Sequence, residues 1–274
     1  MALPTYIDRT TERTTLLGTW RAVFTYRALL RNLVSRDLKL KYRGSALGFL
    51  WSLINPLMML VVYTVAFTVF LDRGGPLFVF LLLVGLLGWT FFATSMAAAT
   101  GSLVDNASLT KSLHFPRAIL PLASVFFNLA QFLLTAVVFV PILLLYYDVA
   151  PSTALLAFPI MLGLQAVCVA GLALTLSALT AMFRDARHLV EVGLGMLFWL
   201  TPIVYTLNDI PPMAARLVAL TPVTPFIRGY QAMIIHQTMP SVDIWLTAVV
   251  YAVVATAVGA RAFGRVEPRL GELL

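Results

Sequence analysis

The sequence predicts an all-α integral membrane protein with six transmembrane helices, an amphipathic helix before them and a helical hairpin before the last span. Two observations predict this fold class. Hydrophobic residues make up 60% of the 274 residues and charged residues only 11%, whereas a soluble domain averages about 25% charged residues. In addition, residues 44–71 contain no charge at all, and about twenty apolar residues are enough for a helix to cross a ~30 Å hydrocarbon core.

A basic block directly precedes this uncharged stretch and contains Arg36, Lys39, Lys41 and Arg43. A charge at the middle of a bilayer costs at least ~2.5–3.5 kcal/mol, so the basic block stays in water or among lipid headgroups. By the positive-inside rule, that side of the membrane is the cytoplasm. The junction therefore predicts both the start of the first span and the orientation of the chain.

The part of the chain before the first span is expected to have two segments. Residues 1–19 are polar and rich in threonine. Residues 20–43 predict an amphipathic helix, since most of its apolar residues fall on one side and Arg27, Arg31, Arg36 and Lys39 on the other. Such a helix lies along the membrane interface with its basic face toward water and headgroups; a soluble helix packed on a partner is the alternative. Residues 44–274 then form the transmembrane domain.

Six segments are long and apolar enough to be spans, with approximate bounds 47–71, 77–100, 119–147, 155–181, 189–205 and 244–262. The fifth is short and ends at Thr201-Pro202, because proline lacks the backbone N–H that a helix needs. With the N-terminus inside, sixteen of the nineteen Lys and Arg residues lie on the cytoplasmic side. This asymmetry predicts that both termini are cytoplasmic, and it explains the net charge of +7 without nucleic acid.

Two predicted cytoplasmic loops are candidates for docking a partner. Residues 102–122, between the second and third spans, mix polar residues with leucines and predict a short amphipathic helix, after which Pro116 and Pro121 steer the chain back. Residues 182–192, between the fourth and fifth spans, read MFRDARHLVEV and are densely charged. Charge runs of this length are usually solvated connectors, and that alternative stays open.

The last outer connection, residues 206–243, is long, punctuated by proline and still apolar. Its segment LVALTPVTPFIRGYQAMII is too short and broken to span and too apolar for a free loop. A re-entrant or interfacial helical hairpin fits, because irregular backbone at membrane depth is tolerated where it is buried in protein or lines a cavity. We expect this hairpin to gate the outer face.

The sequence contains no motif for nucleotide binding, catalysis or a metal site. Walker A and HExxH sequences are absent, and Cys168 is the single cysteine, which excludes a disulfide framework and a cysteine metal site. His188 and Glu191 are one helical turn apart, which favours an ion pair over a metal site. Apart from Glu191 at the inner end of the fifth span, the spans lack the ionisable relays of ion-coupled transporters. The energy source is therefore expected outside this chain.

Aromatic residues are frequent in the predicted spans, among them Trp89, Phe92, Phe198 and Tyr205. Most aromatic residues of this kind belong to interfacial belts or pack between helices. The functional alternative is the wall of a conduit, because flat aromatic faces stack on sugar rings without binding them tightly. A GxxxG pattern at residues 44–48 weakly favours a close helix contact.

Three stretches in order, RDLKLKYRGSALGFLWSLINPL, NASLTKSLHFPRAILPL and FRDARHLVEVGLGMLFWLTPIVY, resemble the membrane subunits of ABC-2-type polysaccharide exporters. This family includes the O-antigen, capsule and teichoic acid permeases, and the resemblance covers nearly the whole chain from Arg36 onward. It implies that two copies of this chain pair with two cytoplasmic ATPase subunits, which bind ATP and Mg, so that this chain is not an enzyme and holds no cofactor. It also implies a bacterial inner-membrane location and export of a lipid-linked polysaccharide.

The resemblance further implies roles for individual residues. The two cytoplasmic loops become elements that couple to the ATPase, with the residues Asn106, Leu109, Lys111, His114, Phe115, Arg117, Arg184, Asp185, Arg187 and His188. The proline-rich hairpin becomes the outer gate, with Pro211, Pro222, Pro225 and Arg228. The candidates for the pathway wall are Trp89, Phe92, Phe198 and Tyr205. An ABC-2-type exporter of a drug or a lipid is the nearer alternative, and an ion-coupled transporter is the alternative from another class.

Overall fold

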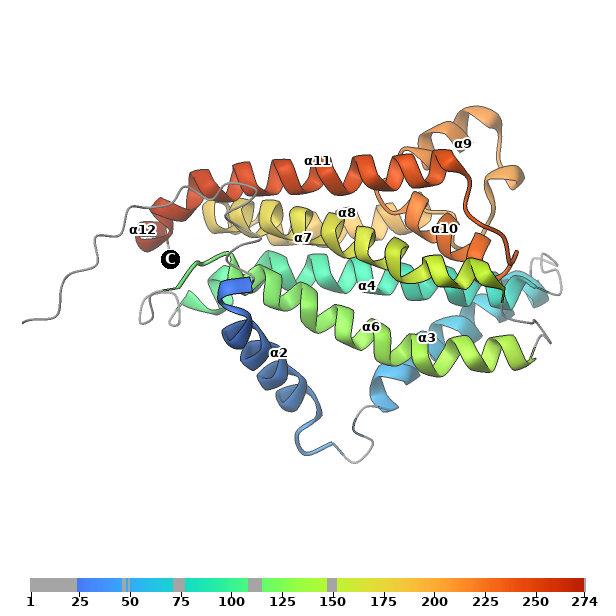
Figure 1. Ribbon diagram of the computed structural model, residues 1–274, viewed down its shortest axis with the longest axis horizontal. Coiled ribbons are helices and arrows are strands. Elements are labelled where there is room, and N and C mark those ends of the chain that lie inside the picture. The colour runs from blue at the N-terminus through green and yellow to red at the C-terminus, as the bar shows by residue number, and fades with distance from the viewer. Residues whose placement is uncertain are drawn as a thin grey trace, which may run out of the picture.

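The computed structural model describes residues 24–45, 48, 50–70, 77–107, 115–146 and 152–273. All regular structure in these residues is helical, and the long helices run side by side along the longest axis of the molecule (Figure 1). Five segments are long and apolar enough to cross a membrane: Leu50–Phe70, Phe78–Asp105, Ile119–Ile142, Thr153–Met182 and Val242–Arg269. They correspond to the predicted spans one to four and six. The all-α membrane fold is thus confirmed, with five such helices among the described residues instead of the predicted six.

The helices follow one another along the chain as α2 (Arg27–Tyr42), α3 (Leu50–Thr64), the π-helical turn η1 (Val65–Phe70), α4 (Phe78–Asp105), α6 (Ile119–Tyr146), η2 (Thr153–Ala157), α7 (Phe158–Met182), α8 (Ala186–Trp199), η3 (Leu207–Asp209), α9 (Pro212–Ala219), α10 (Thr224–Ile234), α11 (Val242–Val266), η4 (Glu267–Arg269) and α12 (Leu270–Leu273). One end of the bundle gathers the carboxyl ends of α4, α7 and α11 and the amino ends of α6 and α8 (Figure 1). We call it the basic end, because it includes Arg117, Arg184, Arg187, Arg265 and Arg269. The opposite end, with α9 and α10, is the hairpin end.

Helices α7 and α11 pack backbone against backbone. A Cβ placed on Gly259 would lie 2.1 Å from the carbonyl oxygen of Gly171, and one on Gly171 would lie 2.3 Å from the carbonyl carbon of Ala255. Buried alanines at positions 248, 252 and 260 continue this face of α11 at helical spacing. Small residues allow this approach, since helices inside a membrane gain packing and not hydrophobic burial when they associate.

Helix α8 replaces the predicted fifth span and is shorter. Its 14 residues rise about 21 Å, which is less than a ~30 Å hydrocarbon core. The helix ends because Pro202 supplies no backbone N–H. In the last turn, the hydroxyl of Thr201 donates to the carbonyl oxygen of Leu197 at 2.7 Å. The chain then turns inward, and the fully buried Ile203 packs against Gly85 of α4. The sequence predicted this stop at Thr201-Pro202, although it placed the approximate bound of the span at Tyr205.

The segment predicted to form a hairpin contains the two short helices α9 and α10, which have opposite environments. Helix α9 leaves Met213 and Leu217 exposed, whereas nine of the eleven residues of α10 are buried. A buried polar pair joins α10 to the bundle: the hydroxyl of Tyr230 donates to Gln165 Oε1 of α7 at 2.5 Å, and Gln165 Nε2 donates to the carbonyl oxygen of Gly88 in α4 at 3.0 Å. The second arm of the hairpin is therefore part of the core at this end.

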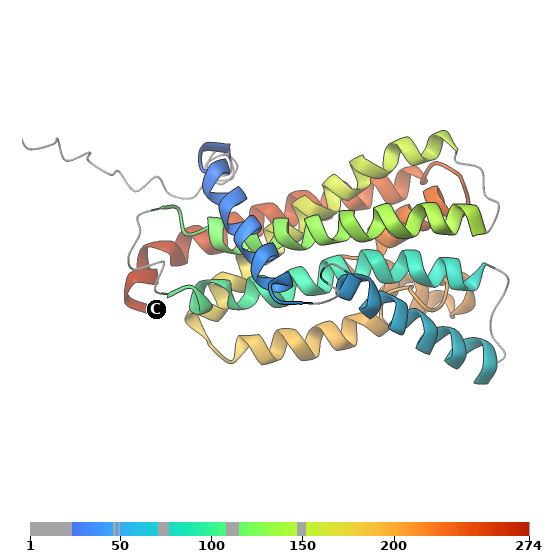
Figure 2. The same cartoon turned by 90° about the horizontal axis from the view of Figure 1, so that it is seen from below.

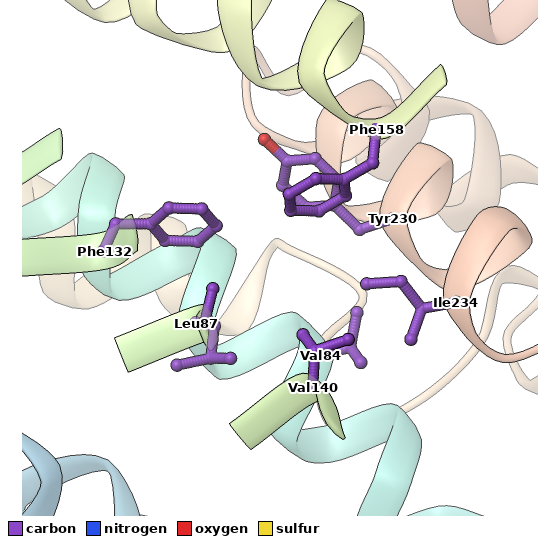
Figure 3. Close-up of a pocket in the computed structure, with 8 residues that line it drawn as sticks. Val84, Leu87, Phe132, Val140, Phe158, Tyr230 and Ile234 are labelled. Atoms are coloured by element: carbon purple, nitrogen blue, oxygen red, sulfur yellow. The ribbon is translucent and has the colours of Figure 1, made fainter. Parts of the chain in front are cut away.

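The ring of Tyr230 lies among apolar side chains of α4, α6, α7 and α10 (Figure 3). Figure 3 shows this ring beside Phe158, with the hydroxyl directed toward α7 and away from Val84. The ring centroids of Tyr230 and Phe158 are 5.0 Å apart, and those of Tyr230 and Phe132 are 6.3 Å apart. The gap between these side chains is narrow and apolar, so it is a packing feature and not a ligand site.

Helix α2 is amphipathic, as predicted, and its described part begins after residue 23. Its buried residues Leu30 and Leu33 join a smaller hydrophobic cluster with the first turns of α6 and the last turn of α11. The predicted basic residues Arg27, Arg31, Arg36 and Lys39 are all exposed. Figure 2 shows α2 running obliquely across the bundle, from the basic end toward the middle of the molecule.

The junction between α2 and α3 is tied to α6. The ammonium of Lys41 donates to Gln131 Oε1 at 2.5 Å and lies 5.8 Å from the centroid of the Phe127 ring. Burial against α6 lowers the pKa of this ammonium below its ordinary value. The GxxxG prediction at residues 44–48 was wrong, because both glycines lie outside the helices. Their φ values are positive, +74° and +50°, and a Cβ added to either would have nothing within 4 Å. They serve the turn, because only glycine adopts this backbone region without strain.

Candidate functional site

A groove lies between α3, α4 and α8 and encloses about 390 Å³, within the ~300–1,000 Å³ of small-molecule sites. Both α3 and α8 lie on the same side of α4 in Figure 2. The residues that line the groove are Asn55, Pro56, Met59, Tyr63, Leu86, Trp89, Thr90, Ala93, Thr94, Leu194, Gly195, Phe198 and Trp199. The helical repeat explains why they meet, since residues four apart share one face: Asn55, Met59 and Tyr63 on α3, and Thr90 and Thr94 on α4.

Aromatic rings from all three helices meet in this groove, with Phe198 at their centre. The Phe198 ring stacks on Tyr63 of α3 with centroids 5.6 Å apart, and it meets Trp89 of α4 edge-on at 5.5 Å. Its neighbour Trp199 lies 5.3 Å away, also edge-on. Aromatic pairs in such geometries each stabilise by about 0.5–1.5 kcal/mol beyond area burial. The cluster therefore links α3, the least buried of the five span-length helices, to the rest of the bundle.

The four aromatic residues predicted for a pathway wall divide into two groups. Trp89 and Phe198 line the groove. Phe92 and Tyr205 lie outside the lining of the groove. The ring of Phe92 is buried in the core, with its centroid 5.8 Å from that of Trp89. The hydroxyl of Tyr205 donates to the carbonyl oxygen of Trp199 at 3.0 Å.

Sequence reasoning missed Asn55 and Tyr63 as groove residues. An amide inside an uncharged span was the signal that could have identified Asn55, because polar residues within spans are functional candidates by default.

Charged residues meet at the basic end, where the end of α4 faces the turn between α7 and α8. Arg187 Nη1 lies 3.5 Å from Asp105 Oδ1, and Arg187 Nε lies 3.9 Å from Glu191 Oε1. The predicted pairing of His188 with Glu191 is present, with Nδ1 and Oε2 3.8 Å apart. These side chains are about half exposed or more, so each pair adds only about 0–1 kcal/mol of stability. The contact of Arg187 with Asp105 joins the two predicted docking loops.

The remaining predicted coupling residues have distinct positions. Leu109, Lys111 and His114 lie outside the described residues. Helix α4 continues to Asp105, so part of the predicted loop helix is the last turn of this span, and Asn106 Nδ2 donates back to the carbonyl oxygen of Ser102 at 2.9 Å.

Beyond the loop, Phe115 packs against the smaller hydrophobic cluster. Arg117 contacts Glu267 twice: its backbone N–H donates to Oε1 at 3.2 Å, and Nη1 donates to the carbonyl oxygen at 3.0 Å. Arg184 and Asp185 are exposed at the α7–α8 turn.

The predicted gate residues lie along the hairpin. Pro211 is exposed just before α9, Pro222 is half-buried between the two helices, and Pro225 is buried in the first turn of α10, a position where its missing N–H costs nothing. Arg228 Nη1 lies 3.9 Å from Asp243 Oδ2 at the start of α11. This contact joins α10 to the last span at the hairpin end.

Comparison with known proteins identifies the family. The ABC-2 type transporter family matches residues 28–235. The chain is 35% identical over 228 residues to the O-antigen export system permease protein RfbA of Myxococcus xanthus, which covers 81% of this chain and 86% of that protein. It is 29% identical over 249 residues to the O-antigen export system permease protein RfbA of Klebsiella pneumoniae, which covers 90% and 95%. Since the family match covers most of the chain and includes α2, the groove and the hairpin, this protein belongs to the ABC-2 type transporter family.

Proposed function

We propose that this chain is the membrane permease subunit of an ABC exporter that moves a lipid-linked polysaccharide, such as O-antigen, across the cytoplasmic membrane. Two copies enclose the pathway, and two cytoplasmic ABC ATPase subunits bind the ATP and Mg and supply the energy. The observation that carries this proposal is the groove, in which Tyr63, Trp89, Phe198 and Trp199 present aromatic rings at the depth of the spans. The names of the relatives support the class of substrate.

The basic end is proposed to face the cytoplasm. It contains the start of α2, the two docking loops and the last helix, whereas Lys41 contacts Gln131 near the middle of α6 and Arg216 and Arg228 lie at the hairpin end. This charge difference favours an inner-membrane orientation with both termini in the cytoplasm. Helix α2 then lies along the inner interface with its exposed basic residues toward headgroups and water.

Helix α8 is proposed to complete a sixth crossing despite its length. The turn after it, residues 201–205, is largely buried against the bundle, so protein and not lipid surrounds its irregular backbone. The hairpin of α9 and α10 then occupies the outer side as a re-entrant gate, with Pro222 and Pro225 between and within its two arms.

The ion pair of Asp105 with Arg187 suggests how force from an ATPase reaches the spans. It connects the end of α4 to the first turn of α8, and these two helices form two of the three walls of the groove. A push on either docking loop would therefore be transmitted to both walls. In this role the predicted residues Arg184, Asp185 and His188 face the ATPase.

Export of glycan from cells that lack their own permease tests the proposal. The chain is expressed with its ATPase partner, or with a partner whose catalytic carboxylate is removed, and surface glycan is measured. We expect glycan at the surface only with the active ATPase. Export that continues without ATP hydrolysis, or that follows a proton gradient, would assign the chain to the ion-coupled class. Export of a drug or a free lipid in place of glycan would assign it to another branch of the family.

A further inference from the structure

We propose that Asn55, Tyr63 and Thr90 form a hydrogen-bonding wall of the groove that recognises the hydroxyl groups of uncharged sugar residues during export. This inference rests on the proposed function and adds the chemical class of the recognised group. Asn55 and Tyr63 come from α3 and Thr90 from α4, and all three line the groove beside the aromatic rings.

The side-chain polar groups of these three residues make no hydrogen bond within the part of the chain that the structure describes. Pairing differs among the other polar side chains of these helices: the buried hydroxyls of Thr64 in α3 and Ser95 in α4 also lack a partner among the described residues, whereas others bond to their own backbone. Asn128 of α6 donates to the carbonyl oxygen of Ser124 at 2.8 Å, and Thr94 of α4 donates to that of Thr90 at 2.6 Å. An unpaired amide or hydroxyl facing hydrocarbon is strongly unfavourable. The groove therefore presents polar groups suited to a polar occupant.

The composition of the wall specifies the class of occupant. Sugar rings offer apolar faces and polar edges, and the groove offers aromatic faces, such as Trp89 and Phe198, next to an amide and two hydroxyls. An acyl chain has no donor or acceptor and would leave all three polar groups unpaired. None of the lining residues is charged, so the wall is not suited to the phosphate part of a lipid carrier. The occupant that satisfies both surfaces is an uncharged part of the glycan.

The positions of the polar groups suggest contact with more than one sugar residue. Asn55 and Tyr63 are eight residues apart on one face of α3, which places their Cα atoms about 12 Å apart along the helix axis. Two such groups on one wall would engage the glycan at successive points. Because each side chain contributes a single neutral hydrogen bond, the glycan would be bound weakly enough to slide along the groove.

Cysteine accessibility tests whether the wall faces a polar path. The native Cys168 is buried with 1% exposure, so an introduced cysteine is the main target of a water-soluble thiosulfonate reagent added to cells. Asn55→Cys is compared with the control Val253→Cys. Val253 lies on the face of α11 that points away from the bundle, and it is 62% exposed. We expect faster labelling of Asn55→Cys, and slower labelling when glycan is held in the complex by an ATPase that binds but does not hydrolyse ATP.

Export by an isosteric variant tests the hydrogen bonds themselves. Asn55→Leu removes the amide but keeps the volume, and we expect normal membrane insertion with glycan export slowed about two- to tenfold, the loss expected for one neutral hydrogen bond. Asn128→Leu is the matched control, because the Asn128 amide is paired within its own helix, and its export should remain at the wild-type rate.

The outcomes distinguish this inference from the proposed function. Wild-type glycan export together with full export by Asn55→Leu would overturn the hydrogen-bonding wall and leave the proposed function standing. Labelling of Asn55→Cys no faster than Val253→Cys would also overturn it, since the amide would then face lipid. Absence of glycan export by the wild-type chain with an active ATPase would overturn both.

Discussion

Replacement of Gly259 by alanine should open the contact between α7 and α11. The new Cβ would lie 2.1 Å from the carbonyl oxygen of Gly171, about 1.3 Å short of the 3.4 Å at which ordinary contact begins. The obstructing atom belongs to the backbone, so the two helices have to separate. A gap of 0.5–1 Å already forfeits about a quarter to a half of the dispersion attraction of the atoms concerned, and overpacked cores lose about 1–3 kcal/mol. The equilibrium between open and closed helix pairs should therefore shift about 5- to 150-fold.

Cys168 provides the assay for this shift. It is the only cysteine of the chain, it is 1% exposed, and it lies on α7 within one turn of Gly171. A maleimide fluorophore reacts with a buried thiol only when the surrounding structure opens, so the rate of labelling reports local opening. In purified protein, Gly259→Ala should be labelled faster than the wild-type chain by the same 5- to 150-fold, if opening and closing are fast relative to reaction.

A second glycine on α7 is the control for this experiment. Gly163 is exposed and has nothing within 4 Å of a built Cβ, so Gly163→Ala should be labelled at the wild-type rate. Gly171→Ala places its Cβ 2.3 Å from the backbone of Ala255 and should behave like Gly259→Ala. Wild-type labelling rates in both Gly171→Ala and Gly259→Ala would refute the backbone packing that we describe.

Three further predictions concern the ends of the bundle and the groove. Arg187→Glu should weaken the coupling of export to ATP hydrolysis, and Asp105→Arg in the same chain should restore it. Little change in thermal stability is expected, because an exposed pair adds only about 0–1 kcal/mol. Unchanged coupling in the single variant would exclude this role. Tyr230→Phe leaves Gln165 Oε1 buried without its donor, which costs about 1–3 kcal/mol and should lower the melting temperature in detergent; a wild-type melting curve would argue against the buried pair. Trp89→Ala should slow export while leaving binding of the ATPase subunit in a pull-down unchanged, and wild-type export would leave Trp89 as a helix-packing residue.

The placement of charge explains why so much of the fold was predictable. The free energy of placing a segment in the membrane depends on the apolar and charged residues of that segment alone. Each boundary between apolar and charged sequence can therefore be located without reference to any other segment. Helices α4, α6, α7 and α11 therefore lie within a few residues of the predicted spans, and the four basic residues predicted for the polar face of α2 are exposed. Helix α8 ends at Trp199, beside the predicted stop at Thr201-Pro202, whereas the approximate bound of that span was placed at Tyr205.

Close contacts between distant segments were not predictable in this way. The glycines of the GxxxG pattern serve a turn, whereas the tight contact joins Gly171 to Gly259, 88 positions later, without a recognisable local motif. The same holds for Glu267, which contacts Arg117 across the basic end. A single glycine or glutamate has no periodicity, so its partner is specified only by how the helices pack.

The sequence by itself determined that this protein lies in a membrane, that it is all-helical, that one end of its bundle is basic and which family it resembles. These properties follow from local hydropathy, charge and short motifs. Only the tertiary structure decided that Trp89 and Phe198 share a groove with Asn55 and Tyr63, that Phe92 and Tyr205 lie outside its lining, and that α10 is buried in the core. Those results depend on the angles and distances at which helices cross, which are set by side-chain packing between segments far apart in the chain.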